Sequence, residues 1–181
     1  MKINSKEFIA NEKKFLIRSA IEKDAKELSA LRLQLDGETE NFDRERGEAF
    51  LDTMDFSNLI QADSIAPKNL LLVAEMNEKI VGYSRCEGSP LKRLAHRVEF
   101  GVGVLQEYWG YGIGKHLLHT SLEWATSSGV KKMTLQVLET NRPAIYLYEK
   151  SGFEIEGILK KDKLLSDGNY YNTIVMGKPL D

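Results

Sequence analysis

Apolar positions repeat every second residue in some segments of this chain and every three to four residues in others, and these two periods predict its elements. Strand periodicity is present at residues 15–21, 70–76, 80–86, 95–104, 133–138, 153–165 and 170–176. Helical periodicity is present at residues 24–35, 44–60, 113–127 and 143–150, most weakly at 44–60. The order β-α-α-β-β-β-α-β-α-β-β predicts an α/β (α+β) fold, a mixed sheet of about seven strands with about four helices on its faces.

Breaker residues between these segments support the division. The four prolines lie between or at the edges of the periodic runs, and Gly129 and Gly152 follow two of the predicted helices, where glycine commonly ends them. Asp167-Gly168 is a strong hairpin signal between the last two strands. We find no repeat or linker. The sequence therefore predicts one domain over residues 1–181, with residues 1–14 as an N-terminal extension.

Composition narrows the class of protein. A chain of 181 residues with 42% hydrophobic and 29% charged residues is typical of a globular domain. The formal net charge of −2 provides no electrostatic footprint for nucleic acid or an anionic membrane, so neither is expected as a partner. The longest apolar run covers only residues 70–74, and the single cysteine, Cys86, excludes an internal disulfide. These features favour a cytoplasmic protein, and they leave a homodimer open.

Three alternating glycines connect a predicted strand to a predicted helix. Gly110, Gly112 and Gly114 allow a tight turn and a close approach of a ligand to the backbone amides. The first amides of a helix have no internal partners, and the helix dipole adds partial positive charge there. The segment therefore predicts a phosphate cradle, although a glycine-rich turn that binds nothing has the same composition.

Two well-known phosphate loops fit this segment badly. The dinucleotide fingerprint G-x-G-x-x-G would need glycine at Lys115 or Leu117. A Walker A loop ending in Gly114-Lys115 would need glycine at Trp109 and Ser or Thr at His116. A different phosphate ligand is therefore indicated.

A second motif follows one strand after the glycine-led helix. Asn141, Ala144, Tyr148, Gly152 and Phe153 match the pattern N-x-x-A-x-x-x-Y-x-x-x-G-F. Together with the loop, this segment resembles the GCN5-related N-acetyltransferase (GNAT) superfamily.

The loop and the C-terminal end extend this resemblance. The loop resembles the acetyl-CoA pyrophosphate motif of that superfamily, Arg/Gln-x-x-Gly-x-Gly/Ala, with Trp109 at the position usually occupied by Arg or Gln. The end of the chain is similar to the branch of ribosomal-protein, polyamine and small-amine acetyltransferases, through Glu156-Gly157, residues 167–170 and Met176.

The resemblance implies a fold, a reaction and a set of cofactor residues. It implies a mostly antiparallel sheet, acetyl-CoA as co-substrate, and direct attack by a primary amine without an acyl-enzyme. The implied acetyl-CoA-binding residues are Val102, Gly103, Val104, Trp109, Gly110, Tyr111, Gly112, Ile113, Gly114, Lys115 and Asn141. Asn favours helix N-caps, so Asn141 has a structural interpretation as well.

Two residues are candidates for catalysis. The resemblance places Tyr148 at the cofactor sulfur as a general acid, although a tyrosine there also suits packing of the helix on the sheet. Glu99, within an otherwise apolar strand, is the candidate base, acting through water. Its alternative is an outward-facing glutamate paired with Arg97 or a lysine.

The acceptor and the alternatives to catalysis stay open. The acceptor is a small amine, an amino acid, a polyamine or a protein N-terminus. The acidic residues between Asp36 and Glu48 either attract a cationic acceptor or form a solvated surface. A non-catalytic acyl-CoA-binding or regulatory module and a nucleotide-binding protein are the competing classes. No metal is expected, because His116 and His119 lack further ligands nearby.

Overall fold

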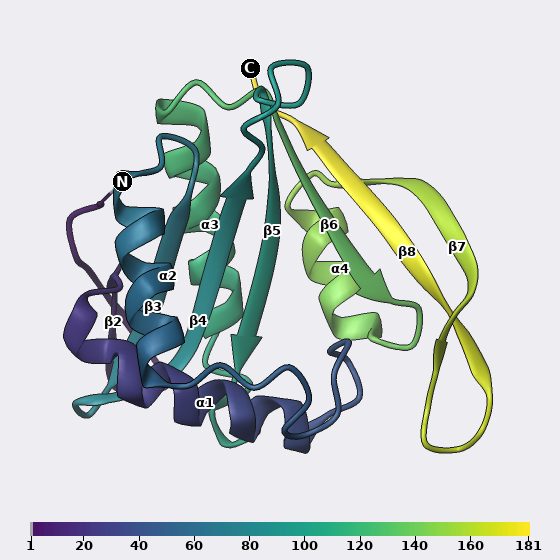
Figure 1. Cartoon of the computed structure of the whole chain (residues 1–181), viewed down its shortest axis with the longest axis horizontal. Helices are drawn as coiled ribbons and strands as arrows, with labels where there is room; N and C mark the ends of the chain where they lie inside the picture. The colour runs from purple at the N-terminus through teal and green to yellow at the C-terminus, as the bar shows by residue number, and fades with distance from the viewer. Residues whose placement is uncertain (1) are drawn as a thin grey trace.

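One sheet with helices on both faces makes up the computed structural model, which describes residues 2–181 (Figure 1). The strands are β1 (Lys6–Ala10), β2 (Lys13–Ser19), β3 (Leu70–Met76), β4 (Lys79–Gly88), β5 (Arg97–Val104), β6 (Lys132–Leu138), β7 (Glu154–Leu164) and β8 (Tyr170–Pro179). The helices are α1 (Ala25–Glu38), α2 (Thr53–Ile65), α3 (Ile113–Ser127) and α4 (Arg142–Lys150), with short 3₁₀ turns η1 (Glu22–Asp24) and η2 (Gln106–Tyr108).

The eight strands run in the order β1-β2-β3-β4-β5-β6-β8-β7. Every neighbouring pair is antiparallel except β5 and β6, which are parallel. The predicted mixed, mostly antiparallel sheet with four helices is therefore confirmed. The single parallel pair lies at the centre, where it joins an N-terminal and a C-terminal half.

One of the eight strands, β1, was not predicted from the sequence. Lys6–Ala10 falls within the residues assigned to an extension, and it pairs with β2 at the edge of the sheet. Asn11 and Glu12 form the connecting turn with φ angles of 49° and 62°. Such a turn usually contains glycine, so the hairpin signal is missing from the sequence. The ring of Phe8 stacks on Phe15 with centroids 5.5 Å apart, which attaches the strand to the core.

The second helix begins later than its apolar pattern suggests. The expectation of a helix over residues 44–60 is wrong in its first half, because α2 spans Thr53–Ile65. The side chain of Asp52 accepts a hydrogen bond from the Asp55 amide, and the Asp55 carboxylate accepts one from the Asp52 amide, a capping box that fixes the start. Phe50, which contributed to the predicted pattern, lies before the helix and is exposed.

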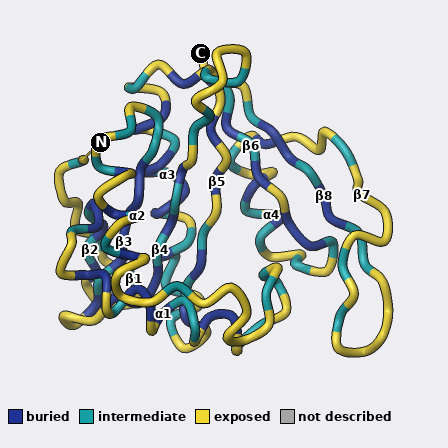
Figure 2. The backbone as a smooth tube through the Cα atoms, in the orientation of Figure 1, coloured by how far each residue is buried: buried dark blue, intermediate teal, exposed yellow. Residues whose placement is uncertain are grey.

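Two separate cores cover the two faces of the sheet. The larger packs α3 and α4 against the strands, and the smaller packs α1 and α2 against β3 and β4 from the other side. In Figure 2 the inner strands such as β3 are largely buried, whereas β7 at the edge is exposed over most of its length. No helix within residues 2–181 is long and apolar enough to cross a membrane.

Candidate active site

The central parallel strands separate soon after they begin. β5 and β6 are paired only at Arg97–Lys132, Val98–Met133 and Glu99–Thr134, and beyond that point they diverge (Figure 1). At the point of divergence the Thr134 hydroxyl lies 3.4 Å from the Val98 carbonyl oxygen. The rest of β5 therefore presents a strand edge to an opening in the sheet, which we call the cleft between β5 and β6.

The register of β5 decides which backbone groups face this cleft. The Leu105 amide donates to the Val81 carbonyl at 2.9 Å, while Val104 is the register partner of Gly82. In an antiparallel ladder this pattern turns the polar groups of Gly103 toward β4 and those of Val102 and Val104 away from it. Two of the three residues predicted on this strand thus offer backbone groups to the cleft.

Gly103 has a different role, since it allows close packing. A Cβ atom at this position would lie 2.9 Å from Leu35 Cδ1 and 3.2 Å from Phe42 Cζ. α1 and the segment after it therefore pack directly onto the backbone of β5. A larger residue would displace them, and this packing matters for the acceptor side of the cleft.

The predicted glycine loop leads into α3 through two left-handed residues. Gly110 has φ of +86° and Gly112, the N-cap of α3, has φ of +74°, a conformation that residues with a Cβ atom rarely adopt. Gly112 has no side chain to cap the helix, so the amides of Ile113, Gly114 and Lys115 are available to a ligand.

Side chains around the loop fix this helix end in place. Ile113 is 1% exposed and anchors the first turn in the core, while Lys115 is exposed on that turn. The ring of Tyr111 lies beneath the Lys13 ammonium group, 5.4 Å from its centroid. The arrangement combines free amides, the helix dipole and nearby positive charge, which together favour an anionic ligand.

Trp109 ties the loop to the strand that faces the cleft. Its indole N–H donates to the Val104 carbonyl oxygen at 2.8 Å, although half of the side chain remains exposed. The bond occupies the only hydrogen-bond donor of the indole and one of the two cleft-facing carbonyls. Trp109 therefore fixes the loop geometry, and its nitrogen is not free for a phosphate.

Asn141 lies at the N-cap of α4 without capping it. The Ile145 amide donates to the Asn141 backbone carbonyl at 3.1 Å, but the side chain makes no capping hydrogen bond. The structural interpretation of this asparagine is therefore not observed. Its amide group is left available where β6 ends and α4 begins.

Tyr148 has a buried ring and an unpartnered hydroxyl. The ring lies 5.8 Å from Phe153 between centroids, and burial raises the pKa of the phenol to about 12. Within residues 2–181 its hydroxyl makes no hydrogen bond, yet no polar side-chain atom there is both fully buried and unpaired. The Tyr148 oxygen must therefore keep some contact with solvent, as a group at a ligand site would.

Glu99 lies on the opposite face of the sheet from Tyr148. Its side chain is exposed, so the apolar surroundings inferred from the strand sequence are absent, and no ion pair to Arg97 or a lysine forms among residues 2–181. It borders a hollow of about 300 Å³ that Thr134, Gln136 and Glu156 also line. Its cross-strand neighbour Glu87 is engaged by Arg85 at 2.8 Å. Glu99 is thus free and accessible to water.

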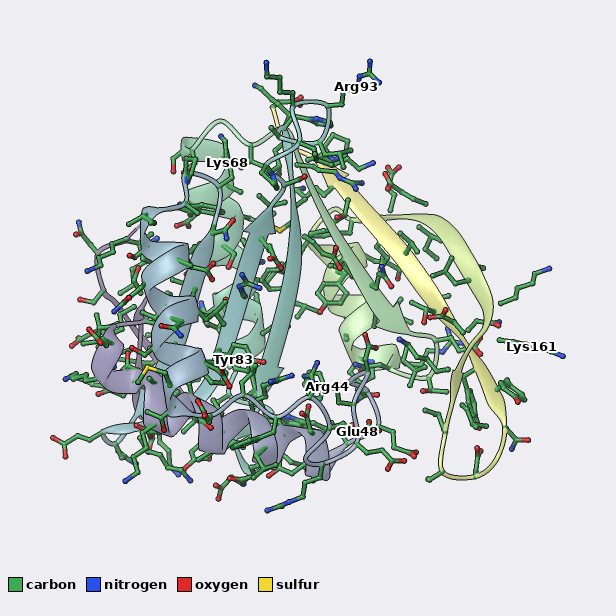
Figure 3. The ribbon with its side chains drawn as sticks, viewed as in Figure 1. Arg44, Glu48, Lys68, Tyr83, Arg93 and Lys161 are labelled. Carbon is green, nitrogen blue, oxygen red and sulfur yellow. The ribbon has the colours of Figure 1, made fainter. Side chains whose placement is uncertain are left out.

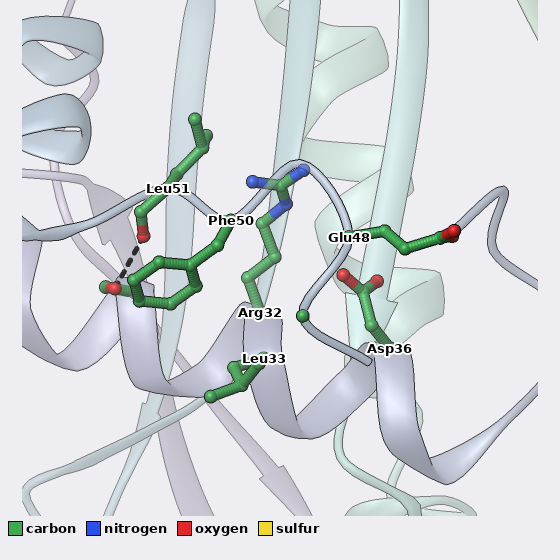
Figure 4. Close-up of a pocket in the computed structure, with 8 residues that line it drawn as sticks. Arg32, Leu33, Asp36, Glu48, Phe50 and Leu51 are labelled. Carbon is green, nitrogen blue, oxygen red and sulfur yellow. Dashed lines mark hydrogen bonds between the residues drawn. The ribbon is translucent and has the colours of Figure 1, made fainter. Parts of the chain in front are cut away.

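A charged cluster that the sequence did not reveal lies on this second face. Asp36, buried on α1, accepts two hydrogen bonds of 3.1 Å from Arg44. Figure 4 shows that Arg32 and Asp36 come from the same helix. Figure 3 places Arg44 and Tyr83 toward the C-terminal end of β5. The run from Asp36 to Glu48 was interpreted as a solvated or cation-attracting surface. Within that run, the feature that indicates a built cluster is the pairing of Arg44 with Asp36. These residues are eight apart in the sequence, and their spacing alone does not reveal the pair.

The histidines have packing roles. His116 stacks on Phe8 with ring centroids 4.1 Å apart, and burial, followed by the charge of Lys115, lowers the pKa of its imidazole. His119 Nε2 lies 3.5 Å from the Ser151 hydroxyl. In the described part of the chain, no group of three or more His, Cys, Asp or Glu residues could hold a metal ion.

Comparisons with known proteins agree with this geometry. The sequence model of the acetyltransferase (GNAT) family matches residues 31–153. An acetyltransferase of the GNAT family from Streptococcus pneumoniae superposes with a TM-score of 0.88 at 28% identity, over 92% of this chain and 99% of that one.

Two curated relatives match the sequence itself. The L-amino acid N-acetyltransferase AaaT of Escherichia coli is 32% identical over 108 residues, 59% of this chain and 66% of that protein. The [ribosomal protein bS18]-alanine N-acetyltransferase of Haemophilus influenzae is 33% identical over 108 residues, 60% of this chain and 69% of that protein. The chain therefore belongs to the acetyltransferase (GNAT) family, the N-acetyltransferases that take their acetyl group from acetyl-CoA.

Proposed function

We propose that this chain acetylates a primary amine by direct attack on acetyl-CoA bound in the cleft between β5 and β6. The observation that carries the proposal is a free helix N-terminus that follows a strand whose edge is left unpaired, with an unpartnered tyrosine in the core on the same face of the sheet. The neutral amine attacks the thioester carbonyl, the carbon–sulfur bond breaks, and one proton leaves the amine as the thiolate gains one. The products are an amide and a free thiol.

The cofactor is held chiefly by backbone groups. The amides of Ile113, Gly114 and Lys115 bind the pyrophosphate, with the left-handed Gly110 and Gly112 shaping the approach. The pantetheine arm pairs with the cleft-facing backbone of Val102, and the amide side chain of Asn141 is the second contact we assign to it. Backbone recognition of this kind does not require the Arg or Gln that Trp109 replaces.

Tyr148 stabilises the departing sulfur. With a pKa of about 12 the phenol stays protonated at neutral pH, whereas a thiol titrates at roughly 8.5. Full proton transfer from this phenol to a thiolate is uphill by roughly 5 kcal/mol. We therefore assign Tyr148 as a hydrogen-bond donor to the developing thiolate, with water completing the protonation.

Glu99 removes the proton of the incoming amine. An alkyl amine has a pKa of about 10.4, so most of it is protonated at neutral pH and cannot attack. Glu99 is free of ion pairs and borders the hollow of about 300 Å³ on the face opposite Tyr148. A carboxylate there attracts the ammonium form and accepts its proton through water.

The acceptors in the names of these two relatives are L-amino acids and the alanine of ribosomal protein bS18, and a further relative is named for spermidine. All are primary amines, and we assign that class to this chain. Acetyl-CoA should be consumed with stoichiometric release of free thiol and formation of an N-acetylated product, followed by mass spectrometry over a panel of amines. Thiol release only at the rate without an acceptor would favour the non-catalytic acyl-CoA-binding module.

The phosphate site is tested by two glycines of matched conformation. Gly110 and Gly168 have φ of +86° and +79°, and a Cβ atom at either would meet nothing within 4 Å. Gly110→Val should weaken acetyl-CoA binding at least about tenfold and reduce the thermal shift that acetyl-CoA produces, while Gly168→Val should not. Equal shifts with ATP or NAD for the unaltered chain would instead support a nucleotide-binding protein.

A further inference from the structure

One of two arginines near the C-terminal half of α1, Arg44, pairs with a buried carboxylate. Asp36 is engaged by Nε and Nη2 of Arg44, and its side chain is 4% exposed. Arg32 donates to the Ala49 carbonyl at 3.0 Å, and its pKa is lowered first by burial and then by the charge of Arg44. Within residues 2–181 Arg44 has no second carboxylate within 4.0 Å, and Arg32 has none. The cluster therefore holds one positive charge in excess, partly removed from water.

A tyrosine of the neighbouring strand β4 lies within the electrostatic influence of this charge. Tyr83 is nearly buried on β4, burial raises its pKa, and Arg44 and Arg32 are the charges that most oppose the rise. No hydrogen-bond partner of its hydroxyl is present among residues 2–181, and the oxygen is not fully buried. A neutral phenol and two guanidinium groups offer donors to a ligand. We call Arg44, Arg32 and Tyr83 the donor set, and such a set of donors complements a carboxylate.

The segment that carries Arg44 spans the wide end of the cleft. We call residues 39–48 the strap. Its Asp43 forms an ion pair with Lys163 of β7 at 2.5 Å, and the Glu40 carboxylate accepts a hydrogen bond from the Ser166 amide at 2.8 Å. The strap therefore joins α1 to the β7–β8 hairpin. Phe42 of the strap lies against Gly103, the register partner of Tyr83. The donor set is therefore held over β4 and β5 at the level of Gly103.

This position is next to the proposed site of chemistry. Val102, whose backbone faces the cleft, precedes Gly103 in β5. A Cβ atom built on Gly101, the residue before Val102, would meet no atom within 4 Å. Glu99 is roughly 13 Å from Gly103 along the strand, at about 3.3 Å per residue. A cationic end and a free carboxylate thus bracket an open stretch of one sheet face.

We infer that the acceptor is an amine with a carboxylate close to it, as in an α-amino acid, and that Arg44, Arg32 and Tyr83 bind that carboxylate. The inference rests on the proposed function and specifies its acceptor. A carboxylate at the donor set leaves the adjacent amine near Val102, and the open space at Gly101 receives the acceptor's side chain. A polyamine would place a second cation against two arginines, which is electrostatically unfavourable.

The acceptor preference of the unaltered chain is the first test. A panel of L-amino acids is compared with the matching α-carboxamides, the decarboxylated amines, spermidine and a peptide with an N-terminal alanine. We expect kcat/KM for the best amino acid to exceed that for its carboxamide by at least about tenfold. Equal or better turnover of the carboxamide, of spermidine or of the peptide would overturn the inference.

The variants locate the preference at the donor set. Arg44→Gln is combined with Asp36→Asn, so that no unpaired carboxylate is left buried. The pair should raise KM for the amino acid about 10- to 100-fold, as loss of a hydrogen bond between charged groups does, with kcat nearly unchanged. Turnover of the carboxamide should change less than about twofold. Tyr83→Phe should give a smaller rise in the same KM.

Arg46→Gln is the matched control on the same strap. Arg46 is exposed, and its aliphatic part lies against Gly37. The Arg46→Gln substitution removes the same charge as Arg44→Gln without altering the donor set. It should leave KM for the amino acid unchanged. An equal rise in Arg46→Gln would mean that the strap acts only through its overall charge, which contradicts the inference.

The two levels of the proposal fail differently. If acetyl-CoA is bound and an amine is acetylated without preference for a carboxylate, only the inference is wrong. If no panel member accelerates thiol release, the proposed function fails and the inference fails with it. Binding of the N-acetylated amino acid in the presence of coenzyme A, measured by calorimetry, adds a readout independent of turnover. It should weaken in the Asp36→Asn/Arg44→Gln variant and persist in Arg46→Gln.

Discussion

The two faces of the sheet are built from different kinds of interaction. On the face of α3 and α4, local backbone geometry makes the site, through left-handed glycines, a free helix N-terminus and a strand edge left open by divergence. On the face of α1 and α2, ion pairs between side chains of different segments make it, such as Asp43 with Lys163 and Asp36 with Arg44. The cofactor side is thus prescribed locally, and the acceptor side is assembled by tertiary contacts.

This difference separates the groups that bind the cofactor from the side chains that select the acceptor. A cofactor common to a whole family is well served by backbone groups, which tolerate changes of side chain. An acceptor that differs between relatives needs side chains that can change without altering the fold. Variants on the first face should therefore alter kcat or acetyl-CoA affinity for every acceptor, and variants on the second should alter KM for some acceptors only.

The largest effect that sharpens this comparison is expected at Tyr148. Tyr148→Phe should lower kcat about 10- to 100-fold for all acceptors, since a hydrogen bond to a charged atom contributes about 1.5–3 kcal/mol. Acetyl-CoA affinity should be nearly unchanged. Tyr146→Phe, two residues away and exposed, is the matched control and should be silent.

The pKa of Tyr148 adds a prediction on pH. Because burial raises it to about 12, the donor stays protonated up to about pH 11, and kcat should show no alkaline limb from this residue between pH 6 and 10. Steady-state kinetics over that range test both statements. An unaltered kcat in Tyr148→Phe would remove the tyrosine from the mechanism and leave it as a packing residue on Phe153.

A smaller, pH-dependent effect is expected at Glu99. Glu99→Gln should lower kcat/KM about tenfold at neutral pH, because protonated amine then has no nearby base. The deficit should shrink toward pH 10, where the free amine with a pKa of about 10.4 becomes abundant without help. Glu154→Gln, exposed on β7, is the control. A profile identical to that of the unaltered chain would exclude Glu99 as the base.

The same contrast explains what the sequence could predict. Gly110, Gly112 and the Asn141–Phe153 motif act within a few residues of their own positions, so their spacing predicted the start of the helix and the family. Periodicity does not encode which strands pair, so the opening between β5 and β6 could not be predicted from it. Glu99 stays a candidate base, but its surroundings were misjudged, because its strand neighbours face the opposite core.

The missed features depend on specific pairings between strands or side chains, which the periodicity of apolar residues does not encode. β1 is held by a turn without glycine, and its strand of five residues has a weak alternation. The start of α2 depends on the reciprocal bonds of Asp52 and Asp55, whereas the apolar residues before it suggested an earlier start. In the sequence Arg44 is one of several charged residues in a row, and only the structure shows that it pairs with the buried Asp36. Charge patterns alone do not distinguish a solvated surface from a built site.

The smallest expected effect is at Trp109, where the two faces are compared most directly. Trp109→Phe removes the indole N–H that holds the Val104 carbonyl, and a neutral hydrogen bond contributes about 0.5–1.5 kcal/mol. We expect acetyl-CoA to bind about threefold more weakly, through a looser loop, while KM for the acceptor stays within twofold. Trp109→His tests whether a ring that keeps an N–H restores binding. A larger change in acceptor KM than in acetyl-CoA affinity would contradict the division between the faces, because a residue of the cofactor loop would then govern acceptor selection.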